Sequence, residues 1–143
     1  MCNCELFSSG NIKTIASQEK DIHMESNRKV ILVAEDETPR RHLIRELLHE
    51  EGYEVLAAAD GKEALRLSGT YEGPIDLLLT DVDMPRLDGI SAYRRISAER
   101  ADIKVLFMSG GMPEFLDVPT GLPFLPKPFV IDALCTKVRE VLA

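Results

Sequence analysis

The sequence predicts an α/β fold in which a sheet of five parallel strands is doubly wound, with helices on both faces. Three short apolar runs, too short for buried helices, have the branched composition of buried parallel strands: residues 30–34, 75–80 and 105–108. Helical patterns alternate with the strands, as right-handed crossover connections require. In such a sheet the carboxyl ends of all strands lie at one edge, where ligands bind.

Two strand–helix units form the first half of the predicted domain. The first strand precedes a helix for which Thr38, before a proline, is the expected N-cap and Gly52 the stop signal. Residues 53–58 form the second strand. Asp60 opens the second helix, which is expected to end near Gly69.

The second half continues the alternation. Asp88 caps the helix after the third strand, and residues 104–108 form the fourth strand. Prolines and glycines between Ser109 and Lys127 leave room for about one or two helical turns, so the fourth helix is expected to be short or irregular. Residues 122–125 then form the fifth strand, and an apolar stripe predicts a final helix over 131–142.

Composition limits the functions that the chain can have. Its 143 residues suit one folded domain, predicted over 28–143, after a polar and aperiodic segment, 1–27, read as a flexible leader. A net charge of −7 argues against direct binding of nucleic acid. Cys2, Cys4 and Cys135 lack metal-ligand spacing and favour a reduced compartment. No apolar stretch reaches the roughly 18 residues of a spanning helix, so we expect no membrane insertion and a cytoplasmic location.

Reactive side chains follow four of the predicted strands. Glu35 and Asp36 follow the first strand, Asp81 the third, Ser109 the fourth and Lys127 the fifth. In the flavodoxin-like strand order 2-1-3-4-5, the first and third strands are neighbours, so the three acids meet. Carboxylates about 4 Å apart repel by roughly 4 kcal/mol at an effective dielectric of about 20, so this cluster needs a proton or a cation. The small number of protein oxygens favours Mg²⁺ over Ca²⁺.

Four motifs at the strand ends resemble those of the receiver domains of two-component response regulators: VILVAED, LLLTDVDMPRLDG, VLFMSG and FLPKPF. The resemblance covers Val30 to about Leu142. It implies that Asp81 is the phosphoacceptor and that Asp36 and Asp81 hold Mg²⁺ with the backbone carbonyl of Asp83. Glu35 would hold the ion directly or through water.

The resemblance also implies a switch. Ser109 would be the hydroxyl that moves onto the phosphoryl group, Phe124 the aromatic whose rotamer follows it, and Lys127 the cation beside the acceptor. The Lys127–Pro128 bond resembles the family's cis peptide.

The expected function is therefore a phosphoacceptor signalling switch rather than an enzyme, although it catalyses its own phosphotransfer and dephosphorylation. The donor would be a phosphohistidine of a sensor histidine kinase or a phosphotransfer protein. Phosphorylation would change the partner-binding surface near the fourth helix and fifth strand. The chain is expected to be a monomer or a weak dimer, and either a standalone regulator or a fragment of a hybrid kinase.

Alternatives from other classes stay open at this point. LLLTDVD also fits a phosphohydrolase of the haloacid-dehalogenase type, which needs an acidic pair downstream of Asp81. A receiver-shaped scaffold without phosphorylation is a second alternative. Glu35 and Asp36 could instead only cap a helix, Lys127 could be a solvated lysine, and Phe124 could only pack in the core.

Overall fold

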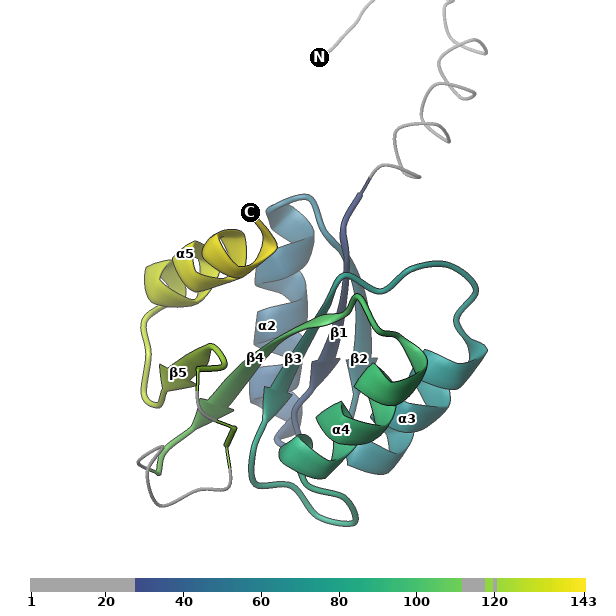
Figure 1. The fold of residues 1–143 in the computed structure, drawn as a ribbon. Helices are drawn as coiled ribbons and strands as arrows, with labels where there is room; N and C mark the ends of the chain where they lie inside the picture. The colour runs from purple at the N-terminus through teal and green to yellow at the C-terminus, as the bar shows by residue number, and fades with distance from the viewer. Residues whose placement is uncertain (1–27, 112–117, 120) are drawn as a thin grey trace, which may run out of the picture.

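The structure is a computed structural model and describes residues 28–111, 118, 119 and 121–143. The predicted leader, residues 1–27, lies outside the described residues, as do Cys2 and Cys4. The elements follow one another along the chain as β1 (Val30–Ala34), α2 (Thr38–Glu50), β2 (Glu54–Ala58), α3 (Gly61–Thr70), β3 (Leu77–Asp81), α4 (Gly89–Glu99), β4 (Lys104–Ser109), β5 (Phe124–Pro126) and α5 (Ile131–Leu142) (Figure 1).

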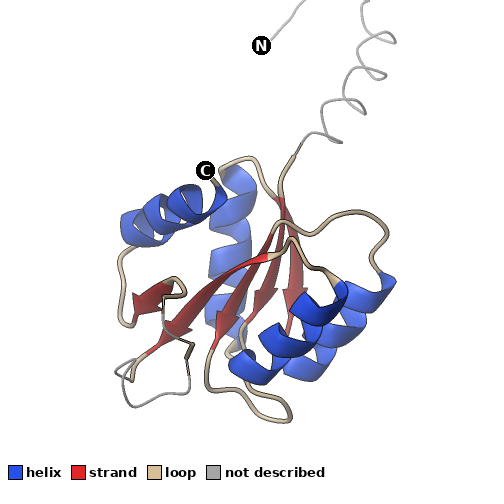
Figure 2. Ribbon diagram, viewed as in Figure 1, coloured by secondary structure: helices blue, strands red, loops and turns tan. Residues whose placement is uncertain are grey.

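The sheet confirms the predicted fold class. Its five strands are parallel and in the order β2-β1-β3-β4-β5, which is the flavodoxin-like order. Helices α2 and α5 cover one face, and α3 and α4 cover the other (Figure 2). Alternate residues of β1 serve the two sides: Ile31 packs in the core under α2 and α5, and Leu32 in the core under α3 and α4. Both faces are therefore buried, which explains why the strands read as continuous apolar runs.

Several predicted boundaries are wrong by one or two residues. Glu37, not Thr38, is the N-cap of α2, and its side chain makes no capping hydrogen bond. The Thr38 hydroxyl accepts a hydrogen bond from Arg41 instead of capping the helix. Helix α3 runs through Gly69 to Thr70, since its hydrogen bonds continue to the amide of Tyr71.

The shifted strands are β2, β3, β4 and β5. β2 begins at Glu54, β3 at Leu77, β4 ends at Ser109 and β5 covers Phe124–Pro126. The predicted fourth helix falls largely on 112–117 and 120, which lie outside the described residues; the described part of that segment contains no helix.

Helix α4 begins directly against the end of β3. Its first residue is Gly89, where an added Cβ would overlap the carbonyl oxygen of Asp81 and come within 2.8 Å of the Thr80 hydroxyl oxygen. The Gly89 amide donates to Val82, and the Val82 amide donates to Met108 of β4. Only glycine permits this close approach of α4 to the end of β3. The two amide hydrogen bonds then hold the backbone around Asp81 between α4 and β4.

Two further findings bear on the expectations from composition. Among the described residues, no helix is long and apolar enough to cross a membrane. Cys135 is a buried free thiol on α5, and burial raises its pKa. It is therefore less reactive as a nucleophile than an ordinary surface cysteine.

Candidate functional site

Three carboxylates meet at the carboxyl edge of the sheet, as the strand order predicts. Glu35 and Asp36 follow β1, and Asp81 is the last residue of the neighbouring β3. One oxygen from each lies within 4.8 Å of the others, with Asp36 exposed and the other two buried. Negative charges this close repel strongly where burial excludes water. The arrangement therefore favours binding of a positive charge.

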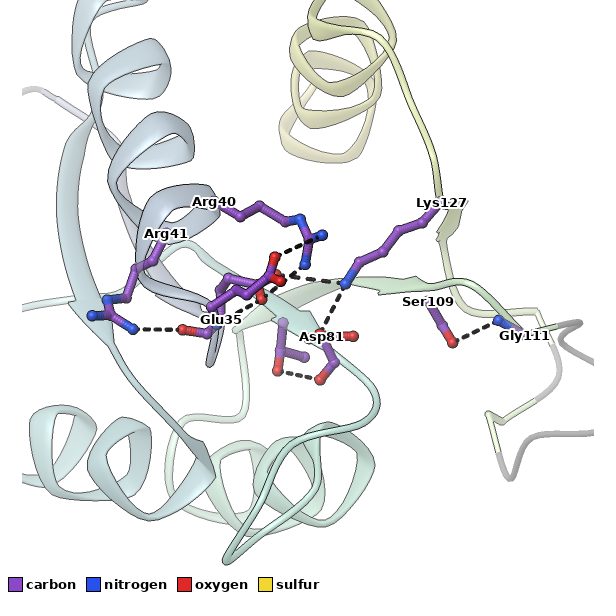
Figure 3. A network of polar contacts seen from close by, with 9 residues as sticks. Glu35, Arg40, Arg41, Asp81, Ser109, Gly111 and Lys127 are labelled. Atoms are coloured by element: carbon purple, nitrogen blue, oxygen red, sulfur yellow. Dashed lines mark hydrogen bonds and ion pairs between the residues drawn. The ribbon is translucent and has the colours of Figure 1, made fainter.

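Glu35 has the most constrained carboxylate of the three. Its side chain is fully buried. Oε2 accepts hydrogen bonds from the Glu37 amide at 3.1 Å and from Arg40 at 3.2 Å (Figure 3). Oε1 has no hydrogen-bond partner among the described residues. Buried polar atoms are almost always hydrogen-bonded. A carboxylate oxygen without a hydrogen bond, with the Lys127 ammonium 3.6 Å away and two other acids beside it, therefore fits a divalent cation with oxygen ligands.

Lys127 supplies the cation of the site. Its Nζ lies 2.9 Å from Asp81 Oδ2 and 3.6 Å from Glu35 Oε1, so it contacts two of the three acids (Figure 3). The Lys127 amide donates to the Ser109 carbonyl, which fastens the start of the β5–α5 connection to β4. The Lys127–Pro128 peptide is cis, as expected. The structure thus places the Lys127 ammonium beside Asp81, and its role in phosphotransfer stays a prediction.

The three remaining predicted residues lie nearby but make other contacts. The buried Ser109 hydroxyl, at the end of β4, accepts a hydrogen bond from the Gly111 amide at 3.0 Å and is directed toward that loop (Figure 3). Phe124 is half-buried and packs on the core under α3 and α4. Asp83 is exposed, two residues beyond Asp81. Their roles stay predictions.

Burial shifts the titration of two of the acids. It raises the pKa of Glu35, against the opposing effects of the Glu37 amide and the Lys127 charge. It also raises the pKa of Asp81, although the hydrogen bond and charge of Lys127 and an amide hydrogen bond from Asp83 act in the other direction. Nearby acids add to both shifts: Asp81 raises the pKa of Glu35, and Asp36 raises that of Asp81.

These shifts predict a pH-dependent metal response. Because the folded pKa values of Glu35 and Asp81 are raised, these groups contribute stability below their unfolded pKa values, and that contribution is lost as pH rises through the folded ones. Mg²⁺ binds the ionised forms and should act oppositely. We expect its effect on the melting temperature to grow as pH rises through the raised pKa values and then level off. Thermal unfolding with and without Mg²⁺ across a pH series measures this, and a pH-independent effect would contradict it.

Sequence reasoning missed two arginines at the start of α2. Arg40 contacts the Glu35 carboxylate, and Arg41 donates to the Glu35 backbone carbonyl at 2.9 Å. A signal was present in the sequence: positive side chains in the first turn of a helix oppose the helix dipole and are unfavourable without a nearby anion. Two arginines there, a few residues after the acids Glu35, Asp36 and Glu37, indicate such a contact.

Sequence reasoning also missed how the loop after β3 is held. Arg86 has a positive φ of 69°, the one non-glycine residue with positive φ among those described, and its Nε lies 2.6 Å from Asp60 Oδ2. Asp60 is itself fixed as the N-cap of α3, since it accepts from the Glu63 amide. The contact ties the loop that follows Asp81 to the start of α3.

Fold and site together define a class: an open α/β protein with a carboxylate cluster and a lysine at the carboxyl edge of its parallel sheet. The family model described as response regulator receiver domain matches residues 31–139. The chain belongs to this family, whose members are phosphoacceptor switches, and its acidic cluster fits a Mg²⁺ site.

Known relatives agree with this membership. The chain is 33% identical over 136 residues to the sensor kinase CckA of Brucella abortus, covering 90% of this chain and 14% of the kinase. A crystal structure of a CckA receiver domain, 40% identical, matches with a TM-score of 0.70 over 80% of this chain and 99% of that one. The receiver protein CpdR of Brucella abortus is 35% identical, over 80% of this chain and 97% of CpdR.

One similar structure bears on the metal. The response regulator TrrA of Thermotoga maritima, solved in complex with Mg²⁺-BeF, is 33% identical and matches with a TM-score of 0.69, over 80% of this chain and 99% of that one. The chain thus spans nearly the full length of some relatives and only about a seventh of the kinase.

Proposed function

We propose that Asp81 accepts a phosphoryl group from a phosphohistidine donor and that the modified chain signals by a change of shape. Glu35, Asp36 and Asp81 would hold Mg²⁺ with the backbone carbonyl of Asp83. The observation that carries the proposal is the contact of Lys127 with Asp81 inside a cluster of three carboxylates. We propose residues 28–143 as the switch unit.

The chemistry follows from the position of Asp81. A carboxylate oxygen attacks phosphorus in line, and the bond from phosphorus to the donor imidazole nitrogen breaks. The nitrogen keeps the electron pair and takes up a proton from solvent. When bound, Mg²⁺ supplies positive charge to the phosphoryl oxygens. Lys127 moves from Asp81 Oδ2 to a phosphoryl oxygen, which keeps its ammonium paired throughout. Water later cleaves the acyl phosphate, so the chain returns to its first state.

Ser109 and Phe124 are proposed to convert the added charge into a new surface. Among the described residues, the Ser109 hydroxyl is held by the Gly111 amide of its own loop, and the phosphoryl group offers a stronger, charged acceptor. If the hydroxyl turns to it, space opens beside β5 for Phe124, which is half-buried in this structure. Output is then a change in the surface of β5 and the preceding segment.

The acids also argue against the phosphohydrolase alternative. That chemistry requires an acidic pair downstream of the nucleophile, whereas the acids that meet Asp81 follow β1 and so lie upstream of Asp81 in the sequence. The site therefore supports a switch that modifies itself, not turnover of a small phosphate ester.

A groove beside the site is proposed as the docking surface of the phosphodonor. It has a volume of about 310 Å³ and is lined mainly by apolar residues of α2 and of the start of α5, together with Arg40 and Lys127. Two of the three exposed large hydrophobic residues among those described line it, Leu43 and Ile131, and the third, Val130, directly precedes Ile131. Because Lys127 both lines the groove and contacts Asp81, a donor seated there brings its phosphohistidine beside the acceptor.

Leu43→Glu is expected to separate docking from chemistry. A charge in the groove should slow transfer from a phosphorylated histidine-kinase core by roughly 5-fold or more, since losing an apolar anchor that the docked donor would bury costs more than about 1 kcal/mol. Labelling by acetyl phosphate, which needs no docking, should be unchanged. Ala101→Glu adds the same charge at an exposed position between α4 and β4 and serves as control. Equal loss with both donors would contradict the docking proposal.

The proposed function is tested by incubation of the chain with acetyl phosphate and Mg²⁺ at neutral pH. Intact-mass measurement should show the addition of one phosphoryl group, and chelation of Mg²⁺ should prevent it. A chain that takes up no phosphoryl group from acetyl phosphate or phosphoramidate would overturn the proposal.

A further inference from the structure

Arg40 holds one acid of the proposed metal site from outside that site. We propose that Arg40 is a resident cation that competes with Mg²⁺ for Glu35 and thereby lowers the affinity for the metal. This inference rests on the proposed function, because it takes the acidic cluster to be a Mg²⁺ site.

The contacts of Arg40 reach the acids on either side of Asp36. Its Nη1 lies 3.2 Å from Glu35 Oε2, and its Nη2 lies 2.8 Å from Glu37 Oε1. The Glu37 amide donates to the same Glu35 oxygen at 3.1 Å, so Oε2 is satisfied by chain atoms while Oε1 is not. The Arg40 guanidinium and the Lys127 ammonium both point at the Glu35 carboxylate (Figure 3).

The placement of Arg40 makes it displaceable. Glu35 is fully buried, but the Arg40 side chain is 38% exposed, so the guanidinium can swing into solvent without opening the core. Arg40 also lies in the first turn of α2, where the helix dipole repels a positive side chain. Glu35 and Glu37 hold the guanidinium there, and a dication that takes the Glu35 carboxylate removes one of these two anchors.

Arg40 differs in this from the three acids of the site. Removing Glu35, Asp36 or Asp81 takes away a metal ligand, so it must weaken metal binding. Removing Arg40 takes away a positive charge that repels Mg²⁺ and frees the Glu35 carboxylate, so it must strengthen metal binding. The opposite sign separates competition from a structural role, since a residue that only holds Glu35 in place would weaken metal binding when removed.

The test compares Mg²⁺ affinities by titration calorimetry at low ionic strength. Arg40→Met keeps the length of the side chain and removes its charge. We expect it to bind Mg²⁺ roughly 3- to 10-fold more tightly than the unchanged chain, as like charges in a partly solvated site require. Arg40→Lys, which cannot bridge two acids with a planar fork, should fall in between. Added salt should shrink these differences.

Arg45→Met is the matched control. It makes the same change of charge on the same helix, but Arg45 pairs only weakly, at 4.0 Å, with its neighbour Glu46. Its affinity for Mg²⁺ should stay within about twofold of the unchanged chain, because an exposed charge paired with Glu46 interacts with the site through solvent of high dielectric. Equal or weaker Mg²⁺ binding by Arg40→Met overturns the inference and leaves the proposed function standing. Absence of Mg²⁺ uptake in all variants overturns both, and thermal unfolding verifies that each variant is folded.

Discussion

Asp81→Asn is expected to abolish phosphoryl uptake from acetyl phosphate in the presence of Mg²⁺. The amide has nearly the same shape as the carboxylate but lacks the charged oxygen that attacks phosphorus. The neighbouring Glu35 is not placed to replace it, because Glu35 is fully buried and its Oε2 is occupied by the Glu37 amide and Arg40. Intact-mass measurement after incubation gives the result directly.

The same variant has a stability signature. Burial and the neighbouring Asp36 raise the pKa of Asp81, so at neutral pH the ionised carboxylate lowers the stability of the fold. Asp81→Asn should therefore unfold at an equal or higher temperature than the unchanged chain without Mg²⁺, which excludes misfolding as the cause of lost labelling. Asp102→Asn, at an exposed turn before β4, is the control and should label normally. Full labelling of Asp81→Asn would refute the acceptor assignment.

Asp36→Ala is expected to have the second largest effect, the loss of Mg²⁺ binding. Asp36 is the exposed member of the cluster, so its carboxylate is accessible to serve as a ligand. Removing it should weaken Mg²⁺ binding by more than the roughly 10- to 100-fold lost when outer-shell partners of metal ligands are removed. Phosphoryl uptake at a fixed, low Mg²⁺ concentration should fall with it.

Calorimetry again provides the measurement, with Glu50→Ala as the control because Glu50 is an exposed acid at the far end of α2. If Asp36→Ala binds Mg²⁺ as tightly as the control, the cluster does not hold the ion as proposed. Rescue of phosphoryl uptake by high Mg²⁺ concentration would show that Asp36 acts through the metal rather than on the donor.

The positions of the acids and of Lys127 were predictable because the topology alone determines them. A buried parallel strand must end where its apolar run ends, and all such ends share one edge of the sheet. Glu35, Asp36 and Asp81 therefore converge whatever the details of the helices. The same logic places Lys127 beside them, since it follows β5.

Side-chain direction was not predictable in the same way. Ser109 lies at the expected strand end, yet its hydroxyl bonds to the Gly111 amide, a local choice between nearly equal rotamers and partners. The N-cap of α2 is another example: Thr38 is the better capping residue by type, but its hydroxyl serves Arg41 and the helix begins one residue earlier than its preference implies. The contact of Arg40 with Glu35 was missed because it depends on how the connection between β1 and α2 folds, and no sequence motif marks it.

Irregular segments follow no period, so their boundaries were the least predictable. β5 is only Phe124–Pro126 and is held by pairing with β4 rather than by an apolar run of its own. β3 begins two residues later than its apolar run, at Leu77, although the Asp76 carboxylate already binds the Val30 amide at 2.7 Å. At Asp76 a hydrogen bond to the side chain takes the place of a backbone bond between strands. A pattern of hydrophobic residues does not reveal such a bond.

The central claim, that Asp81 becomes an acyl phosphate in a reaction that depends on Mg²⁺, is tested most directly by trapping the product. Borohydride reduces an aspartyl phosphate to homoserine, and mass analysis of peptides locates the change. We predict homoserine at position 81 after treatment with acetyl phosphate and Mg²⁺, and none when Mg²⁺ is chelated. Homoserine at another aspartate, or equal conversion at position 81 without Mg²⁺, would contradict the account.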